Sequence, residues 1–202
     1  MRNGLLTGGL FALVLAVLGG WAISTSTSPA IAAEDGPGPN LVINVGGSAT
    51  GTIVIDLLPD VAPKHVEQIV ALAEAGDYDG VVFHRVIDGF MAQTGDVSNG
   101  KRDGDISMAG TGGSTRPDLP AEFSSMPFDR GTVGMARSSD PNSANSQFFI
   151  MFAPAPHLDG QYTVVGQVIQ GMDVVDAIKK GEESQNGSVA DPDYMVKVTV
   201  QK

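Results

Sequence analysis

Short runs of β-branched and aromatic residues, separated by turn-forming residues, dominate the chain from residue 41 onward. Residues 41–45 and 52–58 flank a glycine-rich connection, which predicts a β-hairpin. Residues 83–96 contain two apolar runs separated at Gly89, so they predict two short strands around a bend. Further strands are expected at residues 131–135, 147–152, 163–169 and 195–201.

Two segments have helical spacing instead. In residues 60–76, Pro63 suits a first turn, the apolar residues Val66, Ile69, Val70 and Ala73 share one face, and Gly76 can end the helix. Residues 172–180 predict a shorter amphipathic helix ended by Gly181. Many short strands with only two helices favour a mainly β fold, a closed antiparallel barrel with helical caps.

The N-terminal region has a different pattern. Arg2 precedes an apolar run over residues 5–23, and a Ser/Thr-rich stretch then leads to Ala30-Ile31-Ala32, a small-x-small cleavage signal. We therefore expect a signal peptide over residues 1–32, cut after Ala32 or Ala33, and a flexible leader over residues 33–40. An uncleaved membrane anchor is the alternative, because the apolar run is nearly long enough to cross a bilayer.

Cleavage would remove Trp21, the only tryptophan in the chain. It would leave a periplasmic or secreted protein with no stable membrane association, folded as one domain over residues 41–202. The chain is 42% hydrophobic and 17% charged, which is typical of a globular protein. A net charge of -11 argues against a nucleic-acid partner, and the absence of cysteine excludes disulfides, thiol catalysis and zinc–thiolate sites.

Several motifs that could bind a ligand are incomplete in this sequence. The glycine-rich run 110–113 lacks the Gly-Lys-Thr ending and the following helix of a phosphate loop. Asp103 and Asp105 lack the remaining ligands of a calcium loop. His65 and His157 have no partner at ligand spacing, so neither a metal nor a cofactor is expected. The acidic residues Glu182, Glu183, Asp191 and Asp193 are interpreted as part of a solvated loop.

A set of short segments between residues 83 and 166 indicates a protein family when the segments are taken together. They are Phe-His-Arg-Val-Ile at 83–87, Gly-Phe-Met at 89–91, Gln93, Gly-Asp at 95–96, Met-Ala-Arg at 135–137, Ser-Gln-Phe-Phe-Ile at 146–150, and residues 158–166. In this order they resemble the cyclophilin family of peptidyl-prolyl cis/trans isomerases, over essentially residues 40–202. The resemblance implies an eight-stranded antiparallel β-barrel, closed and capped by two α-helices, with a groove on its outer face.

The chemistry of such a groove needs no nucleophile or metal. Rotation of an X-Pro amide faces a barrier of ~18–20 kcal/mol because C–N resonance must be broken. A guanidinium that donates to the twisted nitrogen stabilises the transition state more than the planar ground state. By resemblance, Arg85 takes this role, and Gln93 anchors substrate backbone and orients Arg85.

The resemblance also implies the binding residues. Phe90, Met91, Phe149 and Leu158 would line the proline pocket, Ala136 and Arg137 would flank the preceding residue, and Gln147 would lie at the groove edge. His157 and Tyr162 would form the far rim. Arg137, Tyr162 and His157 stand where Asn, His and Trp are common in eukaryotic members, and these substitutions are similar to those of bacterial members. The missing Trp predicts weak binding of cyclosporin-type inhibitors.

We therefore expect an exported isomerase that acts on proline-containing polypeptides as they fold. One alternative is a chaperone module that binds proline-containing segments with little catalysis. A second is a secreted hydrolase using His84 or His157, for which the sequence offers no credible nucleophile. His84 is instead interpreted as a half-buried structural residue with its hydrogen bonds satisfied.

Overall fold

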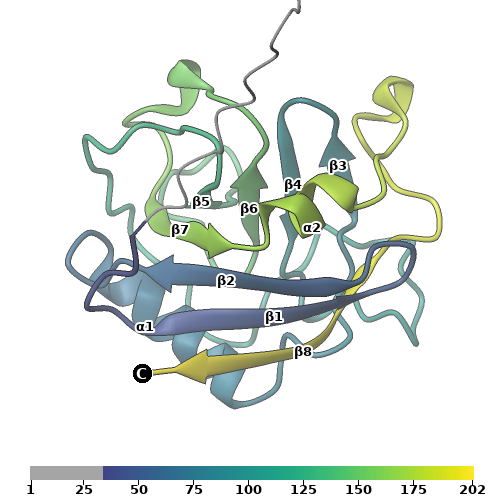
Figure 1. Ribbon diagram of the computed structural model, residues 1–202, viewed down its shortest axis with the longest axis horizontal. Coiled ribbons are helices and arrows are strands. Elements are labelled where there is room, and N and C mark those ends of the chain that lie inside the picture. Colours follow the sequence, from purple (N-terminus) through teal and green to yellow (C-terminus); the bar gives the residue numbers. More distant parts are fainter. Residues whose placement is uncertain (1–33) are drawn as a thin grey trace, which may run out of the picture. The chain divides into compact units, whose positions relative to one another are not determined.

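The computed structural model describes residues 34–202, so the predicted signal peptide and Trp21 lie outside the described residues (Figure 1). Eight antiparallel strands form one curled sheet. They are β1 (Asn40–Gly46), β2 (Gly51–Leu57), β3 (Arg85–Ile87), β4 (Met91–Thr94), β5 (Thr132–Met135), β6 (Phe148–Met151), β7 (Val164–Gln170) and β8 (Tyr194–Gln201). Each strand overlaps a segment that the sequence predicted to be a strand, although the bounds of several differ by one residue. The spatial order is β3-β4-β6-β5-β7-β2-β1-β8.

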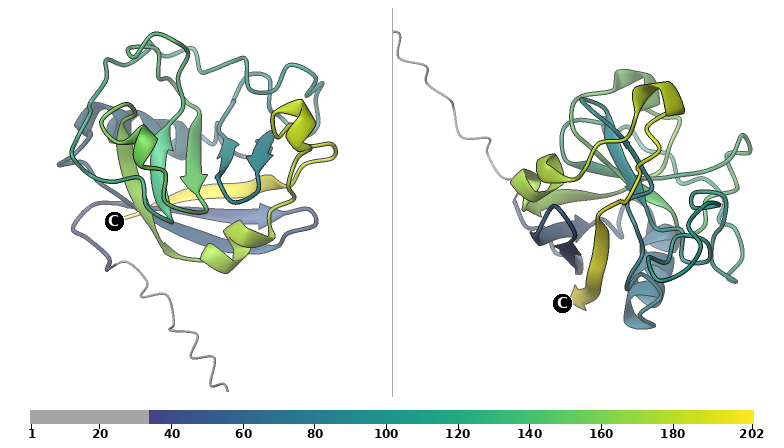
Figure 2. Two further views of the ribbon diagram at one scale, coloured as in Figure 1. Left: turned by 90° about the horizontal axis from the view of Figure 1, so that it is seen from above. Right: turned by 90° about the vertical axis from the view of Figure 1, so that its right-hand side faces the viewer.

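Two α-helices pack against this sheet, as predicted. Helix α1 (Pro63–Glu74) packs against β8, and α2 (Met172–Ala177) packs against β2 (Figures 1 and 2). Short 3-10 helices η1 (Pro156–Leu158) and η2 (Glu183–Gln185) lie in the loops. No helix within residues 34–202 combines the length and apolar character needed to cross a bilayer.

Helix α2 ends earlier than predicted, and Gly181 does not cap it. The chain becomes extended at Ile178, whose side chain is buried, and the N–H of Lys179 then donates to the carboxylate of Asp193. Burial of Ile178 and this polar contact determine where the helix stops, and neither is visible in the local sequence.

The expectation of a closed barrel is wrong, because the sheet is an open half-barrel. The edge of β3 is paired by the loop after α2: Val86 N–H donates to Gly187 O, and Val189 N–H donates to His84 O. Between β3 and β8, only isolated contacts just before β3 span the gap, including the bridge between Val82 and Tyr194. Strand β8 therefore cannot form a ladder with β3, since part of that edge is already occupied.

The same loop is anchored by a buried carboxylate. Asp193 is 1% exposed, against our expectation of a solvated residue, whereas the other acidic side chains of that loop are exposed. One carboxylate oxygen accepts hydrogen bonds from the N–H groups of Ser48 and Ala49 and from the Ser48 hydroxyl, and the other accepts from Lys179 N–H. Burial alone would raise the pKa of Asp193, but these hydrogen bonds outweigh burial and lower it.

We expect Asp193→Asn to lower the free energy of unfolding by about 1.5–3 kcal/mol at pH 7, because an amide cannot accept every one of these buried donors. Urea unfolding followed by circular dichroism measures this change. The folded carboxyl has a lowered pKa, so its stabilising effect is present above its ordinary pKa and disappears as the pH falls through the folded value. The difference between wild type and variant should therefore shrink below about pH 4.

Asp191→Asn is the matched control. Its side chain is fully exposed and lies 3.8 Å from the Lys179 ammonium, so its effect should stay within about 0.5 kcal/mol. Asn also tolerates the positive φ of 50° at this position. Equal stability of the two variants at pH 7 would contradict the structural role of Asp193.

Candidate active site

Strand pairing brings the predicted site residues to one face of the sheet. The β3–β4 pairing sets Arg85 opposite Gln93, and the β4–β6 pairing sets Gln93 opposite Phe149. Residues directly opposite one another project from the same face. The alternating residues Val86, Ala92, Phe148 and Ile150 project from the other face into the main hydrophobic core. The alternation of side chains along these strands therefore gives the sheet one face toward the core and one face toward the candidate site.

A pocket of about 210 Å³ opens on the site face. It is lined by Arg85, Phe90, Met91, Gln93, Ala136, Arg137, Phe149, Leu158 and Tyr162, all of which the sequence analysis named. The Phe149 ring is supported from below by the buried ring of Phe128 at 5.7 Å and meets the Tyr162 ring edge-on at 5.8 Å. This aromatic packing gives the pocket a fixed apolar wall.

Arg85 is held at the rim of the pocket from two sides. Its Nη1 donates to Gln93 Oε1 at 3.3 Å, and its Nε and Nη2 donate to the carbonyl and the side-chain oxygen of Asn186 at 3.0 and 3.1 Å. Burial lowers the pKa of the guanidinium, but the ordinary value is so high that Arg85 stays charged. Within residues 34–202 no carboxylate forms a salt bridge with it, so its charge is available to a ligand.

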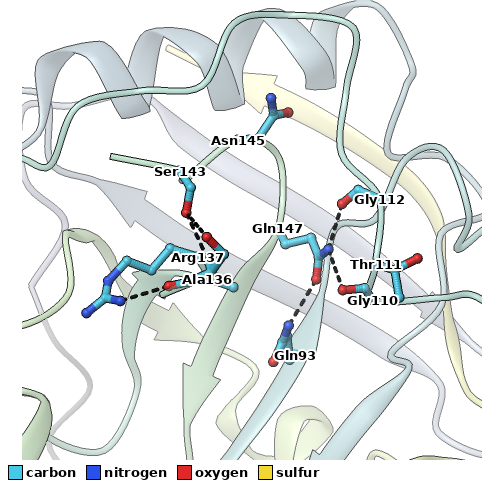
Figure 3. A pocket seen from close by; sticks show the side chains of 10 residues that line it. Gln93, Gly110, Thr111, Gly112, Ala136, Arg137, Ser143, Asn145 and Gln147 are labelled. Atoms are coloured by element: carbon cyan, nitrogen blue, oxygen red, sulfur yellow. Dashed lines mark hydrogen bonds between the residues drawn. The ribbon is translucent and has the colours of Figure 1, made fainter. Parts of the chain in front are cut away.

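Two glutamine side chains extend this polar network. Gln93 Nε2 donates to Gln147 Oε1 at 2.9 Å, and Gln147 Nε2 donates to the carbonyls of Gly110 and Gly112 at 3.1 and 2.7 Å (Figure 3). Gln147 thus lines an adjoining pocket of about 320 Å³ and does not line the apolar one. Its amide links the orientation of Gln93, and through it that of Arg85, to the glycine-rich loop.

That loop is fixed by Asp96, whose side chain is fully buried. Its carboxylate accepts hydrogen bonds from the N–H groups of Ser98, Asn99, Gly110 and Gly112 and from the Ser98 hydroxyl. Burial alone would raise the pKa of Asp96, yet these donors lower it. Two N–H groups of the glycine-rich run, those of Gly110 and Gly112, are therefore bound to a carboxylate of the same chain.

The far rim differs from what the sequence suggested in one respect. Tyr162 lines the apolar pocket, but His157 does not; it is exposed and stacks on Phe90 at 5.8 Å. The Arg137 guanidinium lies 4.4 Å over the Tyr162 ring and donates to Gln161 O. Figure 3 shows it on the opposite side of Ala136 from Gln147.

His84 is more buried than expected, at 8% exposure, and within the described chain neither ring nitrogen has a hydrogen-bond partner. Its ring packs so closely against Gly110 that a Cβ there would meet it at 2.8 Å, and Gly110 also has a φ of +95°. Burial lowers the pKa of His84, although the nearby Asp96 carboxylate acts in the opposite direction.

Sequence reasoning missed two residues of this site. Asn186 was not among the predicted site residues, although it supplies two of the hydrogen bonds to Arg85. Its positive φ of 54° is a signal that a structure shows and a sequence does not. Asp96 was named only within the Gly-Asp motif at 95–96 and was given no role, and its position before a glycine-rich loop was the available hint.

Residues 41–200 match the family described as "Cyclophilin type peptidyl-prolyl cis-trans isomerase/CLD". A probable peptidyl-prolyl cis-trans isomerase of Brucella suis biovar 1 is 63% identical over 153 residues, which cover 75% of this chain and 78% of the relative. Peptidyl-prolyl cis-trans isomerase D of Eremothecium gossypii is 37% identical over 161 residues, covering 74% of this chain and 42% of the relative.

Solved structures show the same fold. The cyclophilin AquaCyp293 from Hirschia baltica has a TM-score of 0.66 and 26% identity, covering 82% of this chain and 74% of its own. A cyclophilin-type isomerase of Cryptosporidium parvum, solved in the presence of the dipeptide Ala-Pro, has a TM-score of 0.68 and 24% identity. That match covers 81% of this chain and 99% of the Cryptosporidium protein.

We expect the His84 ring to titrate with a midpoint below pH 6.5, its ordinary value, because burial disfavours the imidazolium. Proton–carbon NMR spectra of the histidine rings, with His84→Gln for assignment, measure the midpoint. Since the folded pKa is lowered, wild type should lose stability relative to the variant as the pH falls below about 6.5. A midpoint at or above 6.5 would contradict the buried, neutral ring.

Proposed function

We propose that Arg85 provides the positive charge that lowers the barrier to rotation of the X-Pro bond in this enzyme, since the chain belongs to the cyclophilin family of peptidyl-prolyl cis-trans isomerases and is an enzyme of that class. The observation that carries this proposal is a guanidinium held from two sides at the rim of an apolar pocket, with no carboxylate of residues 34–202 paired to it.

The reaction is a rotation, so the site has to act on the twisted amide. As C–N resonance is lost, the proline nitrogen becomes pyramidal and able to accept a hydrogen bond. A guanidinium N–H that donates to this nitrogen stabilises the twisted state more than the planar one. Gln93 and Asn186 hold Arg85 before substrate arrives, which reduces the reorganisation that this step requires.

Substrate binding follows from the shape and lining of the groove. Phe90, Met91, Phe149 and Leu158 would contact the proline ring, and the aromatic support beneath Phe149 would keep that pocket open. Gln93 would bind substrate backbone. The Ala-Pro dipeptide in the Cryptosporidium structure has the chemistry that such a pocket requires.

The neighbouring surfaces would contact the rest of the peptide. Ala136 and Arg137 line both pockets, so they would flank the residue before proline, with Gln147 at the groove edge. The rim near His157 would contribute little binding area, because that ring lies against Phe90 and outside the pocket lining. Cyclosporin-type inhibitors would therefore bind weakly.

We further propose that the substrates are exported polypeptides that fold outside the cytoplasm. The support is the sequence of residues 1–33, in which an apolar run leads to the Ala30-Ile31-Ala32 signal. X-Pro exchange takes tens of seconds without a catalyst, which is slow enough to limit folding of such chains.

We expect Arg85→Ala to reduce kcat/KM for a short X-Pro peptide by about 10²–10³-fold, as for loss of one preorganised donor to a transition state. Exchange spectroscopy on the peptide by NMR measures the rate, and the peptide's line broadening reports binding. Binding should weaken far less than the rate, because the apolar pocket is unchanged.

Arg102→Ala is the control, since Arg102 is an exposed arginine that lies 4.1 Å over the Tyr194 ring, outside both pockets. It should leave the rate unchanged. If Arg85→Ala were as active as wild type, the catalytic role of Arg85 would be wrong. If wild type and Arg85→Ala were equally slow and both still bound the peptide, the protein would be a binding module with little catalysis.

Export predicts a specific mature protein. When the full chain is expressed in a bacterium with an outer membrane, the periplasmic fraction should contain a species whose intact mass begins at Ala33 or Glu34. Its fluorescence should lack a tryptophan component, because Trp21 is the only tryptophan. A full-length mass with tryptophan emission in the membrane fraction would support the anchor alternative instead.

A further inference from the structure

The charge of the candidate site is opposite to that of the whole chain. The sequence contains 23 acidic and 12 basic residues, with a net charge of -11. Among the residues that line the apolar pocket and the adjoining pocket, the charged ones are Arg85 and Arg137, and none is Asp or Glu. Within residues 34–202 no carboxylate forms a salt bridge with either guanidinium. The site is therefore a locally positive surface on an acidic protein.

Arg137 lies where the two pockets meet. Gln93, Ala136 and Arg137 are the residues that line both of them. A peptide with its proline in the apolar pocket and its earlier residues in the adjoining pocket would cross this junction just before the proline. Ala136 and Gln93 are uncharged, so the side chain that precedes the proline would meet the charge of Arg137.

The Arg137 guanidinium is held in place by three contacts. It lies 4.4 Å over the Tyr162 ring, its Nε and Nη2 donate to Gln161 O at 3.4 and 2.9 Å, and its Nη1 donates to Ser138 O at 2.9 Å. One N–H remains on each terminal nitrogen. Because the side chain is already fixed, it loses little freedom when these N–H groups bind an anion.

The two arginines have different neighbours, so they can have different roles. Arg85 is held by Gln93 and Asn186 beside the apolar pocket, where it would act on the bond that rotates. Arg137 forms no hydrogen bond with either of these side chains. Burial lowers the pKa of Arg85 and the Tyr162 phenol raises it, so Tyr162 lies near both guanidiniums. Arg137 can therefore bind a substrate side chain while Arg85 stays available to the amide.

We propose, on the basis of the proposed function, that Arg137 determines specificity by favouring substrates with Glu or Asp immediately before the proline. A carboxylate matches the fork of N–H groups on a guanidinium, and its charge is opposite. Lys at the same position would be repelled by both Arg137 and Arg85, and Gln has the shape of Glu without its charge.

The preference should be modest, because Arg137 is only half-buried and its pairing is screened by water. Ion pairs of this kind change an equilibrium by about two- to fivefold. The pair would form equally in the planar and the twisted state of the amide, so it should lower KM and leave kcat unchanged. This division separates the effect of Arg137 from that of Arg85, which would act on the twisted state.

The test uses three short peptides that differ only in the residue before the proline, which is Glu, Gln or Lys. NMR line-shape analysis at several ratios of peptide to enzyme gives kcat and the dissociation constant separately. At neutral pH and about 0.05 M KCl, we expect the Glu peptide to bind about two- to fivefold more tightly than the Gln peptide. The Lys peptide should bind no more tightly than the Gln peptide. In about 0.5 M KCl the preference for Glu should fall.

The variants are Arg137→Gln and Arg137→Lys, with Arg102→Gln as the matched control. Arg102 also stacks on a tyrosine, at 4.1 Å from the Tyr194 ring, and it lies outside both pockets. The ratio of Glu to Gln affinity should fall to about one in Arg137→Gln and be partly retained in Arg137→Lys. It should not change in Arg102→Gln. Because each variant is compared on the same peptides, intrinsic differences between the peptides cancel.

Several outcomes would overturn the role of Arg137. They are equal binding of the Glu and Gln peptides by wild type, a preference for Glu that survives in Arg137→Gln, and an equal loss of preference in Arg102→Gln. A lower kcat for the Glu peptide would also do so, since it would mean that the carboxylate pairs with Arg85. The wild-type comparison and its salt dependence stand even if Arg137→Gln folds poorly.

These results are separable from those that test Arg85. If Arg85→Ala stayed fully active, the catalytic proposal would fail while a preference for Glu that depends on Arg137 could still be measured. If the preference were absent and Arg85→Ala were inactive, only the specificity proposal would fail.

Discussion

The burial of one carboxylate, that of Asp96, organises the polar half of the proposed active site. A buried charge is tolerated only when it is fully hydrogen-bonded, and here the donors come from a glycine-rich loop folded around it. Once Gly110 and Gly112 donate inward to Asp96, their carbonyls accept from the Gln147 amide. Gln147 then orients Gln93, which contacts Arg85. The position of the guanidinium thus depends on a buried carboxylate that the guanidinium does not contact.

The apolar half of the proposed site depends on strand alternation and on its own hydrophobic cluster. Alternation along β4 and β6 sends every second side chain outward, and the outward Met91 and Phe149 belong to a small cluster separate from the main core. The pocket therefore has its own packed support, which includes Phe128. Rigid walls and a fixed charge are what a rotation about one bond needs, because no covalent step assists it.

Much of this could be predicted from the sequence because it depends on local periodicity. The eight strands and two helices follow from spacing, and ordered motifs identified the residues that line the pocket. Three features could not be predicted, since each depends on a long-range backbone contact without a side-chain signature. Asn186 lies 101 positions from Arg85, Asp193 is buried by the β1–β2 connection, and the edge of β3 is paired by residues after α2.

The pairing of the β3 edge affects how other extended polypeptides can contact this sheet. A short strand with free N–H and C=O groups is a template onto which an extended polypeptide can add as another strand. Here residues 187–189 already pair with part of β3, right beside Arg85. A polypeptide at the proposed site would therefore contact the pocket, and it would not find a free β3 edge for continuous backbone pairing. Residues 187–189 thus leave less of the β3 edge open to such pairing.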